Sequence, residues 1–121
     1  MQDTSKNFHK KLLGRIGENK AVKHLKSLGY KILERNYTTN FGEIDIVAKD
    51  EECLVFVEVK TRSTNDFGVP SEAVNYAKRQ KYKNLANVYM LKNRLTNVDV
   101  RFDVIEITGK DINHIINAFC V

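Results

Sequence analysis

Four charged residues near the middle of the chain have the types and spacing of a site that binds a cation. Glu43 and Asp45 lie two positions apart, and Glu58 and Lys60 repeat this spacing further along. Alternate residues of a β-strand share a face, so each pair presents both side chains on one side of its strand. Carboxylate oxygens suit Mg²⁺, and a nearby ammonium group stabilises developing negative charge. Such a set would support metal-assisted hydrolysis of a phosphodiester.

The stretch 42–62, GEIDIVAKDEECLVFVEVKTR, is expected to bring these residues together as a β-hairpin. Two apolar runs flank a charged segment, which is a hairpin pattern. With a two-residue turn at Glu51 and Glu52, Asp45 lies opposite Glu58. In the same register Glu43 lies opposite Lys60, which places three carboxylates and one amine on one face. A slip of one residue would turn Asp45 to the other side of the sheet, so the predicted site depends on this register.

A simpler interpretation of the same residues needs no metal. The run from Cys53 to Val59 is apolar on both faces, which is typical of a central, covered strand. Glu58 and Lys60 therefore emerge from the end of a buried element, where carboxylates are uncommon unless they are paired or bind metal. Glu58 and Lys60 would pair with each other or with Glu43 at the sheet end. From this stretch alone, the simpler interpretation is favoured.

Charge is unevenly distributed along the 121 residues, whose formal net charge is +5. Residues 1–35 hold nine Lys and Arg against three acids, and residues 61–94 hold seven against two. Between them, residues 36–60 hold two against six. An acidic hairpin flanked by basic segments is expected of a site that cuts a polyanion. Two helices with ordinary solvated lysine faces would give the same pattern and fit the charge equally well.

Length and composition favour a single domain over residues 1–121 without disulfide or zinc staples. Cys53 and Cys120 lack metal-ligand spacing, and the three histidines form no zinc motif. There is no apolar segment for a signal peptide or membrane span, which indicates a soluble cytoplasmic protein. No phosphate-binding glycine motif is present, so no nucleotide cofactor is expected.

Helical periodicity over residues 8–28 predicts a first helix that stops at Gly29, after a frayed segment 1–7. Glu18 lies on its apolar stripe. Most acids so placed reach solvent at the helix edge, but this one is also positioned to point over the sheet toward Asp45. Gly14 and Gly17 would permit close approach of a backbone or a phosphate. The other expected elements are a strand over 30–37, a loop over 63–70, a helix from Pro70 or Ser71 to Asn93, a strand over 98–107 and a short helix in the tail, whose residues Ile112, Ile115, Ile116 and Phe119 have helical spacing.

Six segments together resemble the YraN family of small bacterial proteins over roughly residues 12–119. They are GRIGENKAVKHL, GYKILERNY, GEIDIVAKD, LVFVEVKTR, FGVPSEAV and RFDVIEI. An acid in a first helix followed by Asp45, Glu58 and Lys60 is also similar to the PD-(D/E)xK nucleases. The resemblance implies an α/β, restriction-endonuclease-like αβββαβ core with a mixed central sheet flanked by helices. It further implies kinship with archaeal Holliday junction resolvases.

The resemblance also implies roles for individual residues. Asp45 and Glu58 would be the metal-binding acids, Lys60 the motif lysine and Glu18 the helix acid. Ile44 stands where the motif has proline, a substitution that is frequent in the superfamily. The YraN family often has a basic residue after the Asn-Tyr pair, where this chain has Thr38; the departure bears on one phosphate contact and not on the metal site.

The chemistry then expected is cleavage of DNA by a hydroxide formed on Mg²⁺ or Mn²⁺. Asp45 and Glu58 would bind the ion, with the Val59 carbonyl as a third ligand and Glu18 bound directly or through water. Lys60 would orient the attacking water or stabilise the transition state. The residues expected to hold the nucleic-acid backbone are Arg15, Arg62, Lys78, Arg79 and Lys81. Snorkelling over a helix edge is the commoner explanation for basic residues that interrupt an apolar stripe.

Three hypotheses of function follow. The first is a divalent-metal-dependent DNA endonuclease, with branched DNA among its candidate substrates. The second is a nucleic-acid-binding module that keeps the fold without cutting, and the third is a protein-interaction domain that docks a partner on its acidic hairpin and basic helices. The complete set of Asp45, Glu58 and Lys60 favours the first. Because resolvase-like proteins work as dimers, a homodimer is also considered.

Overall fold

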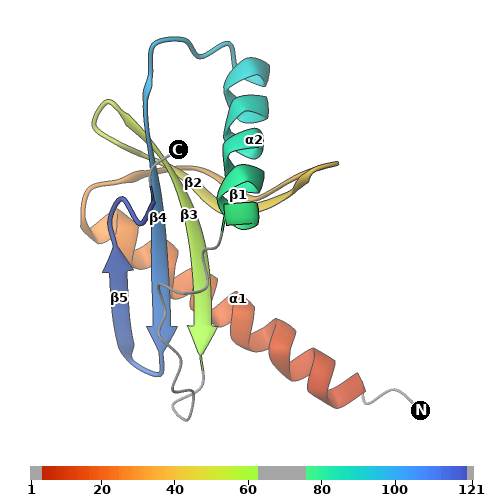
Figure 1. Cartoon of the computed structure of the whole chain (residues 1–121). Helices are drawn as coiled ribbons and strands as arrows, with labels where there is room; N and C mark the ends of the chain where they lie inside the picture. Colours follow the sequence, from red (N-terminus) through yellow and green to blue (C-terminus); the bar gives the residue numbers. More distant parts are fainter. Residues whose placement is uncertain (1–3, 63–75, 120–121) are drawn as a thin grey trace.

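Two helices and five strands make up the computed structural model, which describes residues 4–62 and 76–119 (Figure 1). In chain order the elements are α1 (Thr4–Ser27), β1 (Lys31–Thr39), β2 (Gly42–Asp50), β3 (Cys53–Arg62), α2 (Tyr76–Lys92), β4 (Asp99–Thr108) and β5 (Asp111–Ile115). The expected α/β class and αβββαβ order are confirmed, with one further strand at the end.

The five strands form one sheet in the order β1-β2-β3-β4-β5. Only β3 and β4 are parallel; the other neighbours are antiparallel, so the sheet is mixed as expected. The crossover between β3 and β4 includes α2, which lies on one face of the sheet, while α1 runs across the other (Figure 1). The sheet is therefore covered on both sides, as predicted from the doubly apolar run in β3.

Each helix packs on its own hydrophobic cluster. On the α1 face, Ala21 and Leu25 pack with inward-facing residues of β2, β3 and β4. On the α2 face, Leu85 and Tyr89 pack with Leu54 and Phe56 and with aromatic residues of β4 and the C-terminal segment. Burying such side chains contributes about 1.5–3 kcal/mol each, which fixes both helices on the sheet.

The helix α1 ends as its sequence predicted. Gly29 adopts a φ of 89°, a left-handed conformation that glycine accepts readily. The amide of Tyr30 donates to the carbonyl of Leu25, and that of Gly29 donates to Lys26, which is the Schellman arrangement. At the other end the helix begins at Thr4, four residues before the predicted start at Phe8.

The hairpin of β2 and β3 has the predicted register and turn. Asp50 pairs with Cys53 across Glu51 and Glu52, and the ladder continues to Ile46 opposite Val57. It does not extend to Asp45 and Glu58, and the predicted pair of Glu43 with Lys60 is not formed. The two strands therefore part at Asp45.

Beyond this fork, β1 and β2 continue as a two-stranded hairpin arm, residues 37–44, whose last pair is Thr39 with Gly42. Pairing between β1 and β2 skips Asn36 and Asp45, and Asn36 has a φ of 52°. This kink rotates the arm relative to the sheet. Ile44 consequently packs on the α2 face and Ile46 on the α1 face. Strict alternation had predicted the same face for both.

The C-terminal segment differs from the prediction. Residues Asp111–Ile115 form β5, paired with β4 across a turn in which Gly109 has a φ of 60°. The predicted tail helix is therefore wrong. Ile112 and Ile116 are exposed, whereas Phe119 enters the core on the α2 face. The predicted loop 63–70 and the predicted start of the second helix at Pro70 or Ser71 lie outside the described residues.

Candidate functional site

Asp45 lies at the fork where β2 leaves β3. Its Oδ2 accepts a hydrogen bond of 2.8 Å from the backbone amide of Val59. The carboxylate thus occupies the place of a strand partner for β3. Burial raises the pKa of Asp45 to about 6, and the negative charges of Glu58 and Glu18 act in the same direction, while the Val59 amide opposes them. The single hydrogen bond from Val59 therefore offsets only part of the free-energy cost of ionising Asp45 in this position.

Glu58 emerges from β3 on the α2 face, close to α2. One of its oxygens, Oε1, forms an ion pair with Lys78, and the other, Oε2, is buried and has no hydrogen-bond partner among the described residues. Burial raises the pKa of the Tyr82 phenol, and the nearby negative charge of Glu58 raises it further. Glu58 is thus a buried carboxylate with half of its hydrogen-bonding capacity unused.

Lys60 follows Glu58 on the same face of β3. Burial lowers the pKa of the Lys60 ammonium, the nearby charge of Lys78 lowers it further, and Glu58 opposes both effects. Glu58 and Lys60 therefore lie together on the α2 face of β3 beyond the last β2–β3 pair, and Asp45 is the first β2 residue beyond the same pair. Lys78 adds a second ammonium that the motif did not predict at Glu58.

Glu18 projects from α1 on the opposite face of the sheet from Glu58. Its Oε1 accepts hydrogen bonds from Arg35 Nε at 3.1 Å and from Asn36 Nδ2 at 3.0 Å. This binds α1 to the kink in β1. The helix approaches β3 so closely here that a Cβ added to Gly17 would lie 1.9 Å from the Thr61 hydroxyl oxygen. Glu18 is near enough to Asp45 to influence its pKa, but its carboxylate is already held by β1.

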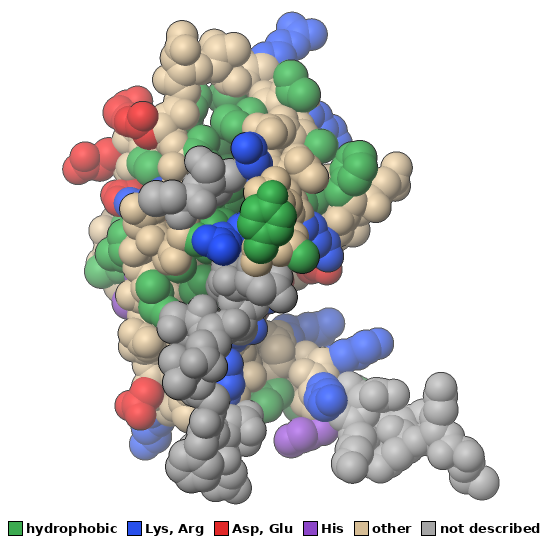
Figure 2. Space-filling model, viewed as in Figure 1, with side chains coloured by type: hydrophobic (Ala, Val, Ile, Leu, Met, Phe, Trp, Pro, Cys, Tyr) green, Lys and Arg blue, Asp and Glu red, His purple; other side chains and the backbone are tan. Residues whose placement is uncertain are grey.

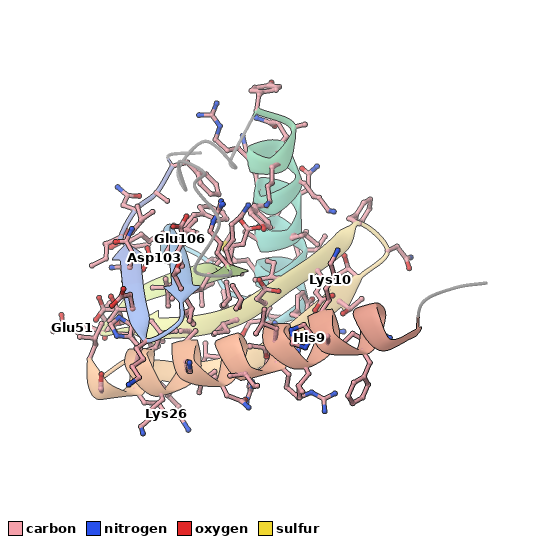
Figure 3. All side chains as sticks on the ribbon, turned by 90° about the horizontal axis from the view of Figure 1, so that it is seen from below. His9, Lys10, Lys26, Glu51, Asp103 and Glu106 are labelled. Carbon is pink, nitrogen blue, oxygen red and sulfur yellow. The ribbon has the colours of Figure 1, made fainter. Side chains whose placement is uncertain are left out.

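A cleft of about 920 Å³ lies between the first half of α1 and the strands at the fork. Asp45, Val59 and Thr61 line it from the sheet, and Glu18 lines it from α1. Four cationic side chains also line it: Lys10, Lys11, Arg15 and Arg35. Figure 2 shows Lys and Arg side chains around a hollow between the body of the molecule and the projecting end of α1, and in Figure 3 Lys10 points from α1 toward the hairpin arm. The cleft therefore combines a partly buried acid with a basic rim.

The cations of this rim were only partly predicted. Arg15 lines the cleft as expected for a residue that contacts nucleic acid, but Lys10, Lys11 and Arg35 were missed. The spacing of Lys11, Arg15 and Glu18, four and three residues apart, places them on one helix face and could have identified Lys11. Arg35 had no such signal, because the strand register shifts between Ile32 and Glu34 and this shift turns Arg35 to the α1 face.

The other four predicted nucleic-acid contacts do not line this cleft. Lys78 is paired with Glu58, and Lys81 lies against Gly42 of the hairpin arm. Arg62 and Arg79 each have a buried Nε without a hydrogen-bond partner among the described residues. Cations thus lie on both sides of the fork, with the open cleft on the α1 side.

The donor atoms at the fork have the chemistry of a site for a hard divalent ion. Asp45 and Glu58 supply carboxylate oxygens, and Glu58 Oε2 is a buried oxygen without a partner among the described residues. Across residues 4–62 and 76–119, however, no set of three or more His, Cys, Asp or Glu side chains is arranged to hold a metal ion. The remaining ligands of such an ion would be main-chain oxygen or water, which Mg²⁺ commonly retains.

A second polar cluster, on β4 and β5, contrasts with the fork (Figure 3). Asp103 is 1% exposed, and its carboxylate accepts hydrogen bonds from the Arg101 guanidinium, the His114 ring and the Asn117 amide. These partners hold the pKa of Asp103 below its ordinary value despite burial. His24 extends the network with a 3.2 Å contact to His114. Asp103 is a fully compensated acid that joins α1, β4 and the C-terminal segment.

The mixed five-stranded sheet and the helix on each face define an α/β protein, and this architecture is consistent with a nuclease-like core. The family can be stated as well. A model described as "Uncharacterised protein family UPF0102" matches residues 17–107, and the chain belongs to this family, whose other name is YraN. The match includes Glu18, Asp45, Glu58 and Lys60.

Relatives in several bacteria are similar over most of their length. A UPF0102 protein of Clostridioides difficile is 53% identical over 108 residues, which cover 88% of this chain and 95% of the relative. One from Caldanaerobacter subterraneus is 44% identical over 121 residues, which cover 94% of this chain and 99% of the relative. One from Thermodesulfovibrio yellowstonii is 53% identical over 109 residues, covering 88% and 95%. In the described part of this chain, no helix is long and apolar enough to cross a membrane.

Proposed function

We propose that this protein hydrolyses phosphodiester bonds of DNA with a divalent metal ion, Mg²⁺ or Mn²⁺, held by Asp45 and Glu58. The observation that carries the proposal is Asp45 itself. It is a carboxylate with a pKa raised to about 6, beside a second acid and on a cleft rimmed by cations. Perturbed acids in clefts are characteristic of functional sites, because a purely structural acid would be better compensated. Asp103 in the same sheet is such a compensated acid.

When bound, the ion would supply a hydroxide near neutral pH and neutralise charge on the phosphate. The protein's own residues would complete the site. Asp45 keeps its position through the Val59 amide, and Glu58 has one oxygen available at Oε2. Lys60, whose pKa is lowered by burial, would hold or donate a proton beside the scissile phosphate. Glu18 would act as a positioning residue, because its bonds to Arg35 and Asn36 hold α1 against the kink.

The basic rim supports a polyanionic substrate. Phosphate groups of DNA lie close together, and each Lys or Arg contact contributes attraction that falls steeply with salt. Lys10, Lys11, Arg15 and Arg35 line the same cleft as Asp45. We therefore propose that the DNA backbone enters on the α1 side of the sheet, whereas the sequence had directed attention mainly to α2.

A cleavage assay with linear, flapped and four-way DNA in Mg²⁺ and in Mn²⁺ tests the proposal. Asp45→Ala and Lys60→Ala should each abolish cleavage, while Lys26→Ala, at the far exposed end of α1, should retain it (Figure 3). Arg15→Ala should weaken binding to all DNA forms. The slope of the logarithm of the binding constant against the logarithm of the salt concentration should become shallower by about 1, as for the loss of one phosphate contact. Cleavage that survives Asp45→Ala unchanged would end the proposal.

The second candidate function is a nucleic-acid-binding module that does not cut. The pairing of Glu58 with Lys78 favours it, because a protein cation already neutralises one of the two carboxylates. Such a module would bind DNA in a salt-dependent way without metal and would show no saturable Mg²⁺ binding. Measuring both quantities on the same sample separates the two functions.

A further inference from the structure

The hairpin arm carries an aromatic side chain at its apex that the fold does not use. Phe41 lies in the turn between Thr39 and Gly42, and it is 62% exposed. Turns of this kind usually carry Asn, Asp or Gly, whose conformations suit them. A phenylalanine there buries little of its ring and gains little for the stability of the fold. Its chemistry is therefore available to a ligand.

The apex is held in place although its ring is exposed. The amide of Phe41 donates to the Thr39 hydroxyl oxygen at 3.0 Å. Lys81 packs its side chain against Gly42, and the Tyr37 ring makes an edge contact with Tyr89 of α2 at a centroid distance of 5.2 Å. The arm is thus braced on α2, which presents the Phe41 ring in a defined position at little cost in ordering.

The arm and the first half of α1 project on the same side of the molecule (Figures 1 and 3). The cleft, with its rim of four cations, lies between the first half of α1 and the strands at the base of the arm, where Asn36 and Asp45 line it. A ligand that lies in this cleft and continues along the arm would meet phosphate-binding groups first and then the exposed Phe41 ring at the apex. Cationic grooves combined with aromatic platforms are how proteins bind nucleic acid whose bases are unpaired.

We propose that Phe41 stacks on an unpaired base of a nucleic acid whose backbone lies in the α1 cleft. This inference rests on the proposed function for the presence of nucleic acid and adds the substrate class: single-stranded, flapped or branched DNA in preference to an intact duplex. In a duplex the bases are stacked on one another, so the ring finds a partner only at a junction, an end or a single strand.

The chain contains no tryptophan, so a Phe41→Trp variant carries a single fluorescent reporter at the apex. Phe8→Trp, on α1 at a position where phenylalanine is 69% exposed, is the matched control. Each variant is titrated with a thymidine oligonucleotide and with a relaxed circular duplex, which has no ends, in the presence of EDTA, so that no DNA is cut. Stacking predicts quenching of Phe41→Trp by the oligonucleotide, weak quenching by the duplex, and little change in Phe8→Trp. Equal quenching of both reporters would overturn the inference.

Affinity provides an independent test. Phe41→Ala should weaken binding of the oligonucleotide by about 5- to 150-fold, the range expected for loss of one stacked base, and leave duplex binding unchanged. Phe41→Tyr keeps an aromatic ring at the apex and should bind the oligonucleotide about as tightly as the wild type. Thermal unfolding of each variant checks that it is folded. If wild-type protein binds the oligonucleotide but Phe41→Ala binds it equally well, the stacking role alone is refuted. If no DNA of any form is bound, the proposed function fails with it.

Discussion

Replacing Asp45 with asparagine should stabilise the fold above pH 6. The pKa of Asp45 rises from 3.8 to about 6 on folding, so its proton is held more tightly in the folded state. Its ionisation then costs folding free energy that is absent below pH 3.8 and fully developed above pH 6. At 1.36 kcal/mol per pKa unit the cost is at most about 3 kcal/mol.

The net gain in Asp45→Asn should be smaller than this limit. Asp45 is only partly buried and faces the cleft, so solvent reduces the cost. The neutral amide oxygen also accepts the Val59 amide less strongly than a carboxylate does, which forfeits about 1 kcal/mol. We expect stabilisation by about 1–2 kcal/mol at pH 7.5, or a rise in Tm of roughly 4–8 °C for a domain of this size.

Denaturation of wild type and variant at pH 7.5 and at pH 4.5 measures this effect. The gain should be present at pH 7.5 and largely vanish at pH 4.5. Asp103→Asn is the opposite control: the pKa of Asp103 is lowered by His114, Arg101 and Asn117, so its charge contributes stability that is lost as pH falls. That variant should lose about 2 kcal/mol or more at pH 7.5. A destabilised Asp45→Asn, or a gain equal at both pH values, would refute the electrostatic reasoning.

Two further predictions concern Lys78 and the helix glycines. Lys78→Gln removes the ammonium that pairs with Glu58, so Mg²⁺ affinity measured by calorimetry should rise roughly tenfold, about 1.4 kcal/mol. The control is Lys83→Gln, at an exposed position on the same helix, which should leave the affinity unchanged. An unchanged affinity in both variants would contradict the predicted competition between Lys78 and Mg²⁺. Gly17→Ala should destabilise the protein by about 1–3 kcal/mol in urea unfolding, because the new methyl group meets Thr61. Gly14→Ala meets no atom within 4 Å and should stabilise by about 0.5–1 kcal/mol; the reverse order would show that α1 does not lie so close to β3.

The sequence was sufficient to predict the central hairpin and its register. The doubly apolar run of β3 and the acidic Glu51–Glu52 turn indicated a covered strand and a two-residue connection, and both are confirmed. Strand periodicity could not show that the ladder ends at Ile46, because the fork depends on a left-handed Asn36 and on the Asp45 side chain replacing a backbone acceptor. These two local departures give the cleft its position.

The tail was mispredicted for a different physical reason. Ile112, Ile115 and Ile116 fit helical spacing, but Gly109 supplies a tight turn that returns the chain alongside β4. Pairing with a long neighbouring strand satisfies the backbone better than a short isolated helix would. Arg35 was also missed, because a register shift between Ile32 and Glu34 decides on which face of the sheet its side chain lies.

The central claim is that Asp45 and Glu58 bind one divalent ion, and a Mg²⁺ titration followed by NMR tests it most directly. Saturable shifts of the Asp45, Glu58 and Val59 amides are predicted in the wild type. They should be lost in both Asp45→Asn and Glu58→Gln, while each variant remains folded by thermal unfolding. Absence of saturable binding in the wild type, or binding that survives both substitutions, would contradict the account.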